Sequence, residues 1–270
     1  MSETDLSWVD GDVDVETPNA ARMYDYYLGG SHNFAHDRAA AARALEVTPA
    51  MIPGARANRA FLQRVVRYCL DAGIRQFLDL GSGIPTVGHV SEIAHAVDPS
   101  ARVAYVDLEP VAVAHTYRML GDVPTVSVTQ ADLQDPQAVL NAPGVAGLLD
   151  FSQPVAVLAV AVLHFVPDAK DPAAILDAYC AAVPTGSVLA VSHITDHYDT
   201  PERVAEIGRL YSSTTNAARH RSFADFTALL GNRELVDPGA VYVTDWRPSA
   251  GSVPADSART AFWGALVKVE

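Results

Sequence analysis

Short apolar runs alternate with helical stretches through the middle of the chain. Runs of this length predict strands, and the stretches between them predict helices. The expected strands cover 76–80, 103–107, 125–129, 155–162 and 187–194, and the expected helices cover 87–97, 110–120, 137–149 and 172–183. Alternation at this spacing indicates an α/β fold, in which a doubly wound, mostly parallel sheet carries helices on both faces.

The strand expected at 155–162 lacks polar alternation, which is typical of a central strand buried on both faces. Later in the chain the pattern predicts two more helices, 201–218 and 222–230. Two late apolar runs, 240–244 and 261–269, predict a terminal antiparallel hairpin with a Pro-, Gly- and Ser-rich loop at 247–256. The sheet is therefore expected to be seven-stranded.

Helical periodicity also dominates the first part of the chain. It begins at Thr17-Pro18, a capping residue followed by a proline that suits a first helical turn, and it stops at Gly29-Gly30. Further helices are expected at 35–45 and 55–72. The acidic residues 1–17 are expected to be a mobile leader. With no internal repeat or break in composition, we expect one domain over 18–270, made of a helical lead-in (18–72) and a sheet core (73–270).

Composition narrows the classes of partner. The 270 residues are 49% apolar, which rules out global disorder, and carry a net charge of −13, which repels nucleic acid and anionic membranes. The longest apolar run, 154–163, is half the ~20 residues of a membrane helix, and the N-terminus lacks the apolar core of a signal peptide. Cys69 and Cys180 read as buried free thiols in a reducing compartment, so we expect a cytoplasmic protein.

A glycine-rich segment, Asp79-Leu80-Gly81-Ser82-Gly83, directly follows the first expected strand. In doubly wound sheets, ligands bind at the carboxyl ends of strands, where glycine lets the backbone approach them closely. The segment is a poor dinucleotide fingerprint, because Thr86 stands where the third glycine would be, and no Gly-Lys-Ser/Thr of a phosphate-binding loop follows.

Carboxylates end the next two expected strands. Asp107 closes the second strand and can accept hydrogen bonds from both ribose hydroxyls. Asp132 follows the third strand beside Leu133, a pair suited to an adenine amine and ring. Alone, each acid could equally be a helix cap or a solvated turn residue. Together, three such features at consecutive strand ends indicate a nucleoside site.

This set of motifs resembles class I S-adenosylmethionine-dependent methyltransferases over roughly residues 70–195. A narrower resemblance, to a bacterial methyltransferase family formerly labelled a domain of unknown function, covers nearly the whole chain. It rests on Ala21-Arg22-Met23-Tyr24-Asp25-Tyr26-Tyr27-Leu28-Gly29-Gly30, Asn58-Arg59, Asp79-Leu80-Gly81-Ser82-Gly83-Ile84-Pro85-Thr86 and Leu163-His164-Phe165-Val166-Pro167-Asp168. The resemblance implies a Rossmann-like fold and S-adenosyl-L-methionine as methyl donor, leaving S-adenosyl-L-homocysteine as product.

The motifs and the resemblance together give a set of expected donor-binding residues: Asp79, Gly81, Ser82, Gly83, Asp107, Leu108, Asp132, Leu133 and Leu163. The helical lead-in is expected to fold over the donor as a lid. Arg22, Tyr24 and Asn33 are then candidate partners for the methionine carboxylate. The alternative is a helix that only packs on the sheet, with Arg22 in a surface ion pair.

Methyl transfer from a sulfonium is an in-line displacement that depends mainly on alignment. A general base is needed only if the nucleophile must lose a proton first. His164, after the fourth expected strand, is the candidate for that catalytic role, although its ring could instead bond the loop backbone. His193 and His197, like His32 and His36, lack a third ligand, so no metal site is expected.

The sequence therefore predicts a methyltransferase acting on a small-molecule acceptor. Two alternatives stay open. One is a protein that binds S-adenosylmethionine as a sensor without catalysis, since methyltransferases share no universal catalytic residue. The other is a nicotinamide-dependent oxidoreductase, which the missing third glycine and the site at Asp132 disfavour.

Overall fold

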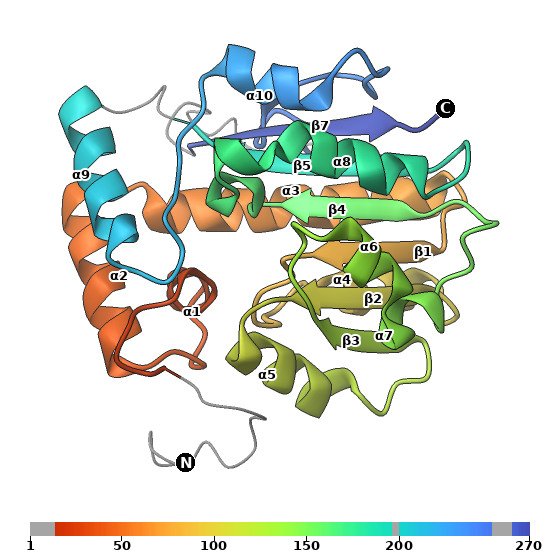
Figure 1. Cartoon of the computed structure of the whole chain (residues 1–270), viewed down its shortest axis with the longest axis horizontal. Coiled ribbons are helices and arrows are strands. Elements are labelled where there is room, and N and C mark those ends of the chain that lie inside the picture. The colour runs from red at the N-terminus through yellow and green to blue at the C-terminus, as the bar shows by residue number, and fades with distance from the viewer. Residues whose placement is uncertain (1–13, 196–199, 250–260) are drawn as a thin grey trace.

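A computed structural model describes residues 14–195, 200–249 and 261–270 and contains one seven-stranded sheet, in the order β3-β2-β1-β4-β5-β7-β6 (Figure 1). The first five strands run parallel, and β7 is antiparallel to both β5 and β6. The strands are β1 Gln76–Leu80, β2 Arg102–Asp107, β3 Val126–Gln130, β4 Ala156–Val160, β5 Val188–Ile194, β6 Val241–Tyr242 and β7 Phe262–Lys268. The predicted sheet and its terminal hairpin are confirmed.

Helices cover both faces of the sheet and one end of it (Figure 1). The α-helices are α1 Ala20–Tyr27, α2 Ala35–Val47, α3 Met51–Asp71, α4 Val90–Val97, α5 Pro110–Leu120, α6 Pro136–Asn141, α7 Pro143–Ala146, α8 Pro172–Ala181, α9 Pro201–Ser212 and α10 Phe223–Leu230. Two short 3₁₀ helices, η1 Leu163–Phe165 and η2 Asp168–Lys170, follow β4.

Several helix boundaries differ from expectation for local reasons. Helix α4 starts at Val90 because the side chain of His89 caps it by accepting from the Glu92 amide, just after Gly88 with its φ of +77°. The helix expected over 137–149 is split into α6 and α7, because Pro143 has no amide hydrogen to continue α6.

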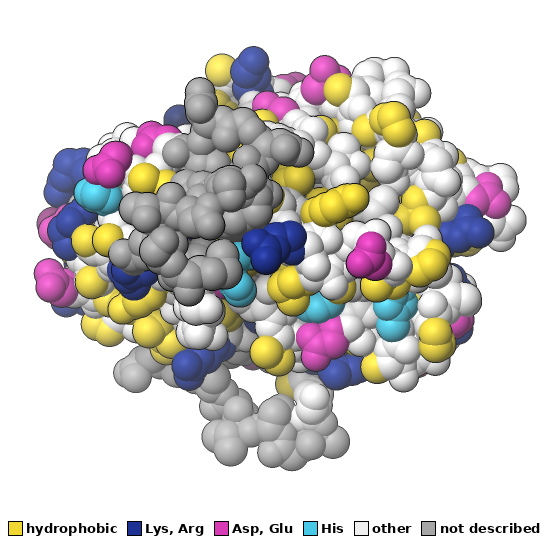
Figure 2. All heavy atoms as spheres, turned by 90° about the horizontal axis from the view of Figure 1, so that it is seen from below, with side chains coloured by type: hydrophobic (Ala, Val, Ile, Leu, Met, Phe, Trp, Pro, Cys, Tyr) yellow, Lys and Arg dark blue, Asp and Glu magenta, His cyan; other side chains and the backbone are white. Residues whose placement is uncertain are grey.

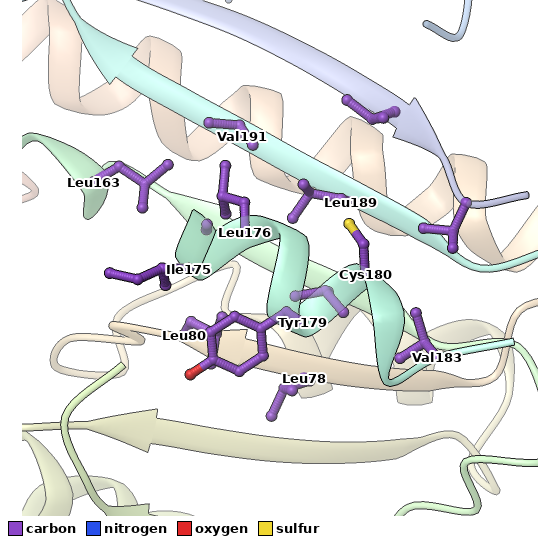
Figure 3. Packing of buried hydrophobic residues seen from close by; sticks show 14 of the residues in the cluster. Leu78, Leu80, Leu163, Ile175, Leu176, Tyr179, Cys180, Val183, Leu189 and Val191 are labelled. Atoms are coloured by element: carbon purple, nitrogen blue, oxygen red, sulfur yellow. The ribbon is translucent and has the colours of Figure 1, made fainter. Parts of the chain in front are cut away.

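One face of the sheet is covered by α6, α7, α8 and α10, and α8 shows how. Its buried residues recur at three- and four-residue spacing: Ile175, Leu176, Tyr179 and Cys180. Figure 3 shows these side chains filling the space between α8 and the sheet, beside residues of β1 and β5. Each large apolar side chain buried in this way contributes about 1.5–3 kcal/mol.

The opposite face is covered largely by α3 and α4. Phe61, Val65 and Cys69 of α3 are fully buried in one cluster with residues of β1, β2, β4 and β7. Helix α3 therefore belongs to the layer that covers the sheet, although it lies in the segment expected to be a lid. Both Cys69 and Cys180 are free and buried, as predicted, and burial raises the pKa of the Cys69 thiol to about 12.

A separate helical cap, which we define as α1, α2 and α9, stands at the end of the sheet toward which β2, β3 and β4 run (Figure 1). Met23, Ala44, Ile207 and Tyr211 share one buried cluster there. Helix α9 thus joins the cap from far along the sequence, and the start of α3 packs with the cap while the rest of α3 covers the sheet.

Parts of two expectations lie outside the described residues: most of the 1–17 leader and much of the 247–256 loop. None of the described helices combines the length and the apolar character that crossing a membrane requires.

Candidate active site

The glycine turn after β1 brings bare backbone to the carboxyl end of the sheet. Gly81 and Gly83 have φ of +66° and +64°, a region that favours glycine. A Cβ on Gly81 would lie 2.2 Å from Cγ2 of Val162, so the turn packs tightly against the end of β4. A Cβ on Gly83 would meet no atom within 4 Å. Open space therefore adjoins the backbone of Gly83, as a site for close approach of a ligand requires.

Asp107, at the end of β2, is held by the backbone of that turn. Its Oδ2 accepts from the Gly83 amide at 2.7 Å and its Oδ1 accepts from the Glu109 amide at 2.9 Å. Burial raises the pKa of the carboxyl group, and these amides oppose the rise. Each oxygen keeps a lone pair for a further donor, such as a ribose hydroxyl. Leu108 lies beside it, 54% exposed on the cavity wall.

Asp132 and Leu133 follow β3 and face the same cavity. The Asp132 carboxylate accepts from the Gln134 amide at 2.9 Å, which fixes its orientation. The Leu133 carbonyl accepts from the Tyr179 hydroxyl of α8 at 2.9 Å. Because β3, β2 and β1 are neighbours in the sheet, the turn after each strand contributes to one wall.

Asp79 and Arg59 form a pair of opposite charges at the cavity. Asp79 is buried in β1, and burial raises the pKa of its carboxyl group to about 7, although the charge of Arg59 opposes the rise. Arg59 reaches the cavity from α3, with its guanidinium carbon 6.0 Å from the ring centre of Tyr24. The Nε of Arg59 is buried and has no hydrogen-bond partner among the described residues.

Arg59 was given no role by the sequence, although it stands in a motif of the resemblance. The only sequence feature that marks Arg59 is the Asn58-Arg59 pair in an expected helix. That pair does not reveal that α3 passes the end of β1. Tyr24, which was expected at the donor, does line the cavity. Its hydroxyl donates to the Ala55 carbonyl at 3.1 Å and accepts from Asn58 at 3.0 Å.

Arg22 and Asn33, the other candidate partners for the carboxylate, do not line the cavity. Arg22 is 1% exposed and pairs with Asp37 and Glu109, each at 3.0 Å. The Asn33 amide donates to the buried Asp25 at 2.8 Å. Both side chains brace the cap, because buried donors and charges take the nearest internal partners.

The two candidate residues in the turn after β4, Leu163 and His164, point to different places. Leu163 is fully buried in the core near the Ile175 end of α8 (Figure 3) and does not line the cavity. His164 does line it, with its Nδ1 buried and without a hydrogen-bond partner among the described residues. Burial, aided by His193, His220 and Arg221, holds the pKa of His164 well below its usual range. The ring is therefore neutral at physiological pH and has a free lone pair on one nitrogen.

His193 lies behind His164, with ring centres 5.4 Å apart. Its Nδ1 is 2.7 Å from its neighbour's carbonyl at Ile194, and its Nε2 is 2.6 Å from a guanidinium nitrogen of Arg221. A carbonyl only accepts and a guanidinium only donates, so His193 carries its proton on Nδ1. His197 lies outside the described residues. Within the described part of the chain, no group of three or more candidate ligands gathers to hold a metal.

The residues that do line the cavity surround a volume of about 440 Å³, within the range of small-molecule sites. Strand ends form one wall: Asp79, Gly81, Ser82, Gly83, Asp107, Leu108, Asp132 and Leu133. The cap and α3 form the other. A family model described as S-adenosyl methyltransferase matches residues 7–270 of this chain. The chain belongs to this methyltransferase family. The resemblance seen in the motifs is confirmed.

Solved structures agree with that assignment. This methyltransferase is 35% identical to a DUF574 family protein from Streptomyces avermitilis, with 96% of this chain and 100% of that chain covered and a TM-score of 0.91. It is 33% identical to a putative methyltransferase from Thermobifida fusca, with 100% of both chains covered and a TM-score of 0.90. A comparison with curated proteins found no match.

S-adenosylmethionine is the cofactor of this methyltransferase, and the residues present fit it. The open space beside Gly83 admits a ligand against the backbone, and the partnerless Nε of Arg59 is a donor suited to a carboxylate. The bound cofactor would supply a methyl group already activated on a sulfonium sulfur.

Proposed function

We propose that this methyltransferase transfers the methyl group to a small-molecule acceptor, with the donor held at the ends of β1, β2 and β3. The single observation that carries the proposal is the convergence of Gly81, Asp107 and Asp132 on one cavity wall. In this proposal Asp107 accepts hydrogen bonds from the ribose hydroxyls. Asp132 accepts from the adenine amine, and Leu108 and Leu133 enclose the ring.

Two further residues hold the amino-acid end of the donor. The carboxylate of Asp79 pairs with the donor's ammonium group, and Arg59 binds its carboxylate through the partnerless Nε. The negative Asp79 thus faces the positive ammonium group of the ligand, and the positive Arg59 faces its negative carboxylate. Tyr24, whose ring lies beside the Arg59 guanidinium, limits where that side chain can move.

His164 is the proposed proton acceptor. As the acceptor's nucleophilic atom bonds to the methyl carbon, the carbon–sulfur bond breaks and its electron pair stays on sulfur. The proton lost by a hydroxyl nucleophile passes to the neutral imidazole of His164 and then to solvent. The low pKa of His164 keeps the ring free of a proton beforehand. The protein otherwise contributes alignment and exclusion of water.

Further parts of the proposal concern partners and location. The net charge of −13 supports an acceptor other than nucleic acid, and Figure 2 shows acidic and basic side chains interspersed on the described part of one face. Free buried thiols support action in the cytoplasm, and the relatives from Streptomyces and Thermobifida support a bacterial source.

Calorimetric titration with S-adenosylhomocysteine, adenosine and NAD tests the donor site. We expect S-adenosylhomocysteine to bind, and Arg59→Gln to weaken it by about tenfold or more while adenosine affinity stays unchanged. Arg56→Gln, an exposed change on the same helix, is the control. Binding of NAD with none of S-adenosylhomocysteine would refute the proposal. Asp107→Ala should weaken both nucleosides.

A labelled-methyl assay against candidate metabolites then separates an enzyme from a sensor. Transfer of label that Asp107→Ala abolishes identifies catalysis at this site. Tight donor binding without transfer to any acceptor would point to the sensor alternative.

A further inference from the structure

We infer that the cap side of the cavity binds a neutral aromatic acceptor with a hydroxyl group, a phenol, and this inference rests on the proposed function. We call this region the acceptor half and define it by Tyr27, Phe165, Ile207 and Tyr211. All four side chains line the cavity, away from the strand ends that carry the residues assigned to the nucleoside. They come from α1, η1 and α9.

The acceptor half is apolar and built from rings. Tyr27, Ile207 and Tyr211 are at most 8% exposed and belong to the buried cluster of the cap. The rings of Phe165 and Tyr211 have centres 6.4 Å apart at an interplanar angle of 36°. An aromatic ligand gains both apolar burial and ring contacts against such a wall.

Hydrogen-bonding capacity is left over within this apolar wall. The hydroxyls of Tyr27 and Tyr211 are 3.4 Å apart, and the described residues offer them no other hydrogen bond. Two hydroxyls that share one bond retain one O–H donor and several lone pairs. Burial raises the pKa of both phenols, so both stay neutral. The pair can therefore bond an uncharged polar substituent of the acceptor.

Charge along the cavity disfavours an ionised acceptor. Among the described residues that line the cavity, four are acidic: Asp79, Asp107, Glu109 and Asp132. These lining residues include one arginine, Arg59, and no lysine. Arg59 is assigned to the donor carboxylate. An anionic acceptor would lose its hydration without gaining a cation in return. A protonated amine has no lone pair with which to attack the methyl carbon.

The position of His164 beside the aromatic wall favours a phenol over an aliphatic alcohol. Its ring centre is 4.2 Å from that of Phe165, so His164 adjoins the acceptor half. A phenol hydroxyl is far more acidic than an aliphatic one, so a neutral imidazole at this position takes its proton more readily. In the methyl transfer, the phenol oxygen bonds to the methyl carbon and the carbon–sulfur bond breaks, with its electron pair staying on sulfur. The phenol proton goes to the His164 ring.

The test titrates three probes of one shape into protein saturated with S-adenosylhomocysteine: neutral 2-naphthol, anionic 2-naphthoate and cationic 2-naphthylmethylammonium. We expect 2-naphthol to bind at least about tenfold more tightly than either ion. Ile207→Trp, which fills the acceptor half, should abolish its binding. The matched control Ala205→Trp lies on the exposed side of α9 and should not affect it.

The outcomes distinguish this inference from the proposed function. If S-adenosylhomocysteine itself fails to bind, the proposed function fails and the inference falls with it. If it binds normally but 2-naphthoate or the ammonium probe binds as well as 2-naphthol, only the acceptor class is overturned. The same holds if no probe binds, or if Ile207→Trp leaves 2-naphthol binding unchanged.

Discussion

The buried environment of the Asp79 side chain disfavours its carboxylate form unless a positively charged ligand group lies beside it. It is 6% exposed, and burial raises the pKa of its carboxyl group from 3.8 to about 7. The folded protein therefore holds the Asp79 proton more tightly than the unfolded chain does. Its contribution to the free energy of unfolding is lost as pH rises from about 4 to about 7. An ammonium group beside the carboxylate would reverse that cost.

This reasoning predicts how Asp79 links affinity to pH. Binding of S-adenosylhomocysteine should strengthen as pH rises toward about 7 and level off above it, because the ionised carboxylate pairs with the ligand's ammonium. Calorimetry between pH 5.5 and pH 8 measures the effect. Asp79→Asn should bind weakly at every pH, yet raise the ligand-free Tm at pH 8, where the buried charge is costly. A wild-type affinity that does not change with pH would contradict the assignment.

Gly83 supplies a second prediction at this scale. Gly83→Ala should reduce S-adenosylhomocysteine affinity by about tenfold or more, because its methyl group would enter the space that the ligand needs. Left-handed backbone also costs alanine about 1–2 kcal/mol. Gly29→Ala is the matched control, since Gly29 has a φ of +83°, open space around it and no place at the cavity. Both variants should lose similar Tm, and only Gly83→Ala should lose affinity.

At the scale of elements, α1 is fixed in place by a buried ionic network. Arg22 of α1 pairs with Asp37 of α2 and with Glu109, just before α5. Asn19, the N-cap of α1, donates to Glu109 at 2.7 Å. Glu109 is two residues from Asp107, so the cap is attached to the loop assigned to ribose.

Arg22→Met tests the network. It would leave Asp37, which is fully buried, without its cation, and breaking a buried pair in this way typically costs about 3–5 kcal/mol. We expect a lower free energy of unfolding in urea, with Arg43→Met, an exposed change on α2, as the control. If Arg22 instead bound the donor carboxylate, the variant would lose affinity for S-adenosylhomocysteine while adenosine binding and stability stayed unchanged.

How far the sequence predicts each element depends on the range of the interactions that form it. The sequence predicts that Gly81, Asp107 and Asp132 lie close together, because the carboxyl ends of adjacent parallel strands meet at one edge of the sheet. Arg22 and Arg59 were not distinguishable: both are arginines on lead-in helices, and only the path of each helix decides which one reaches the cavity. Leu163 was misplaced toward the cavity because the 3₁₀ turn η1, which directs it into the core, leaves no periodic signal.

Over the whole molecule, the cap and the sheet are interleaved in the sequence. Helix α9 returns from β5 to pack with α1 and α2, and α3 runs from the cap to the sheet. We propose that residues 18–270 form one domain. Its parts share a core-forming helix, so they should lose structure together.

A single unfolding transition is the corresponding prediction. Circular dichroism, which reports the helices, and tryptophan fluorescence, to which Trp246 and Trp263 contribute from the sheet side, should give coincident curves in urea. S-adenosylhomocysteine at about 100 times its Kd should raise the free energy of unfolding by about 2.7 kcal/mol. On heating, the Tm seen by circular dichroism and the Tm seen by fluorescence should then rise equally, by several degrees. An early transition seen by only one probe would show that the cap unfolds independently.

The Arg22–Asp37–Glu109 network has one more consequence, for how molecules are exchanged with solvent. Swinging α1 outward would separate charges buried at 1% and 0% exposure, a cost that thermal motion rarely meets during a catalytic cycle. We therefore expect α1 to stay in place as one wall of the cavity during turnover. In that case the acceptor and the used donor enter and leave past other segments, and the geometry around Glu109 does not change between turnovers.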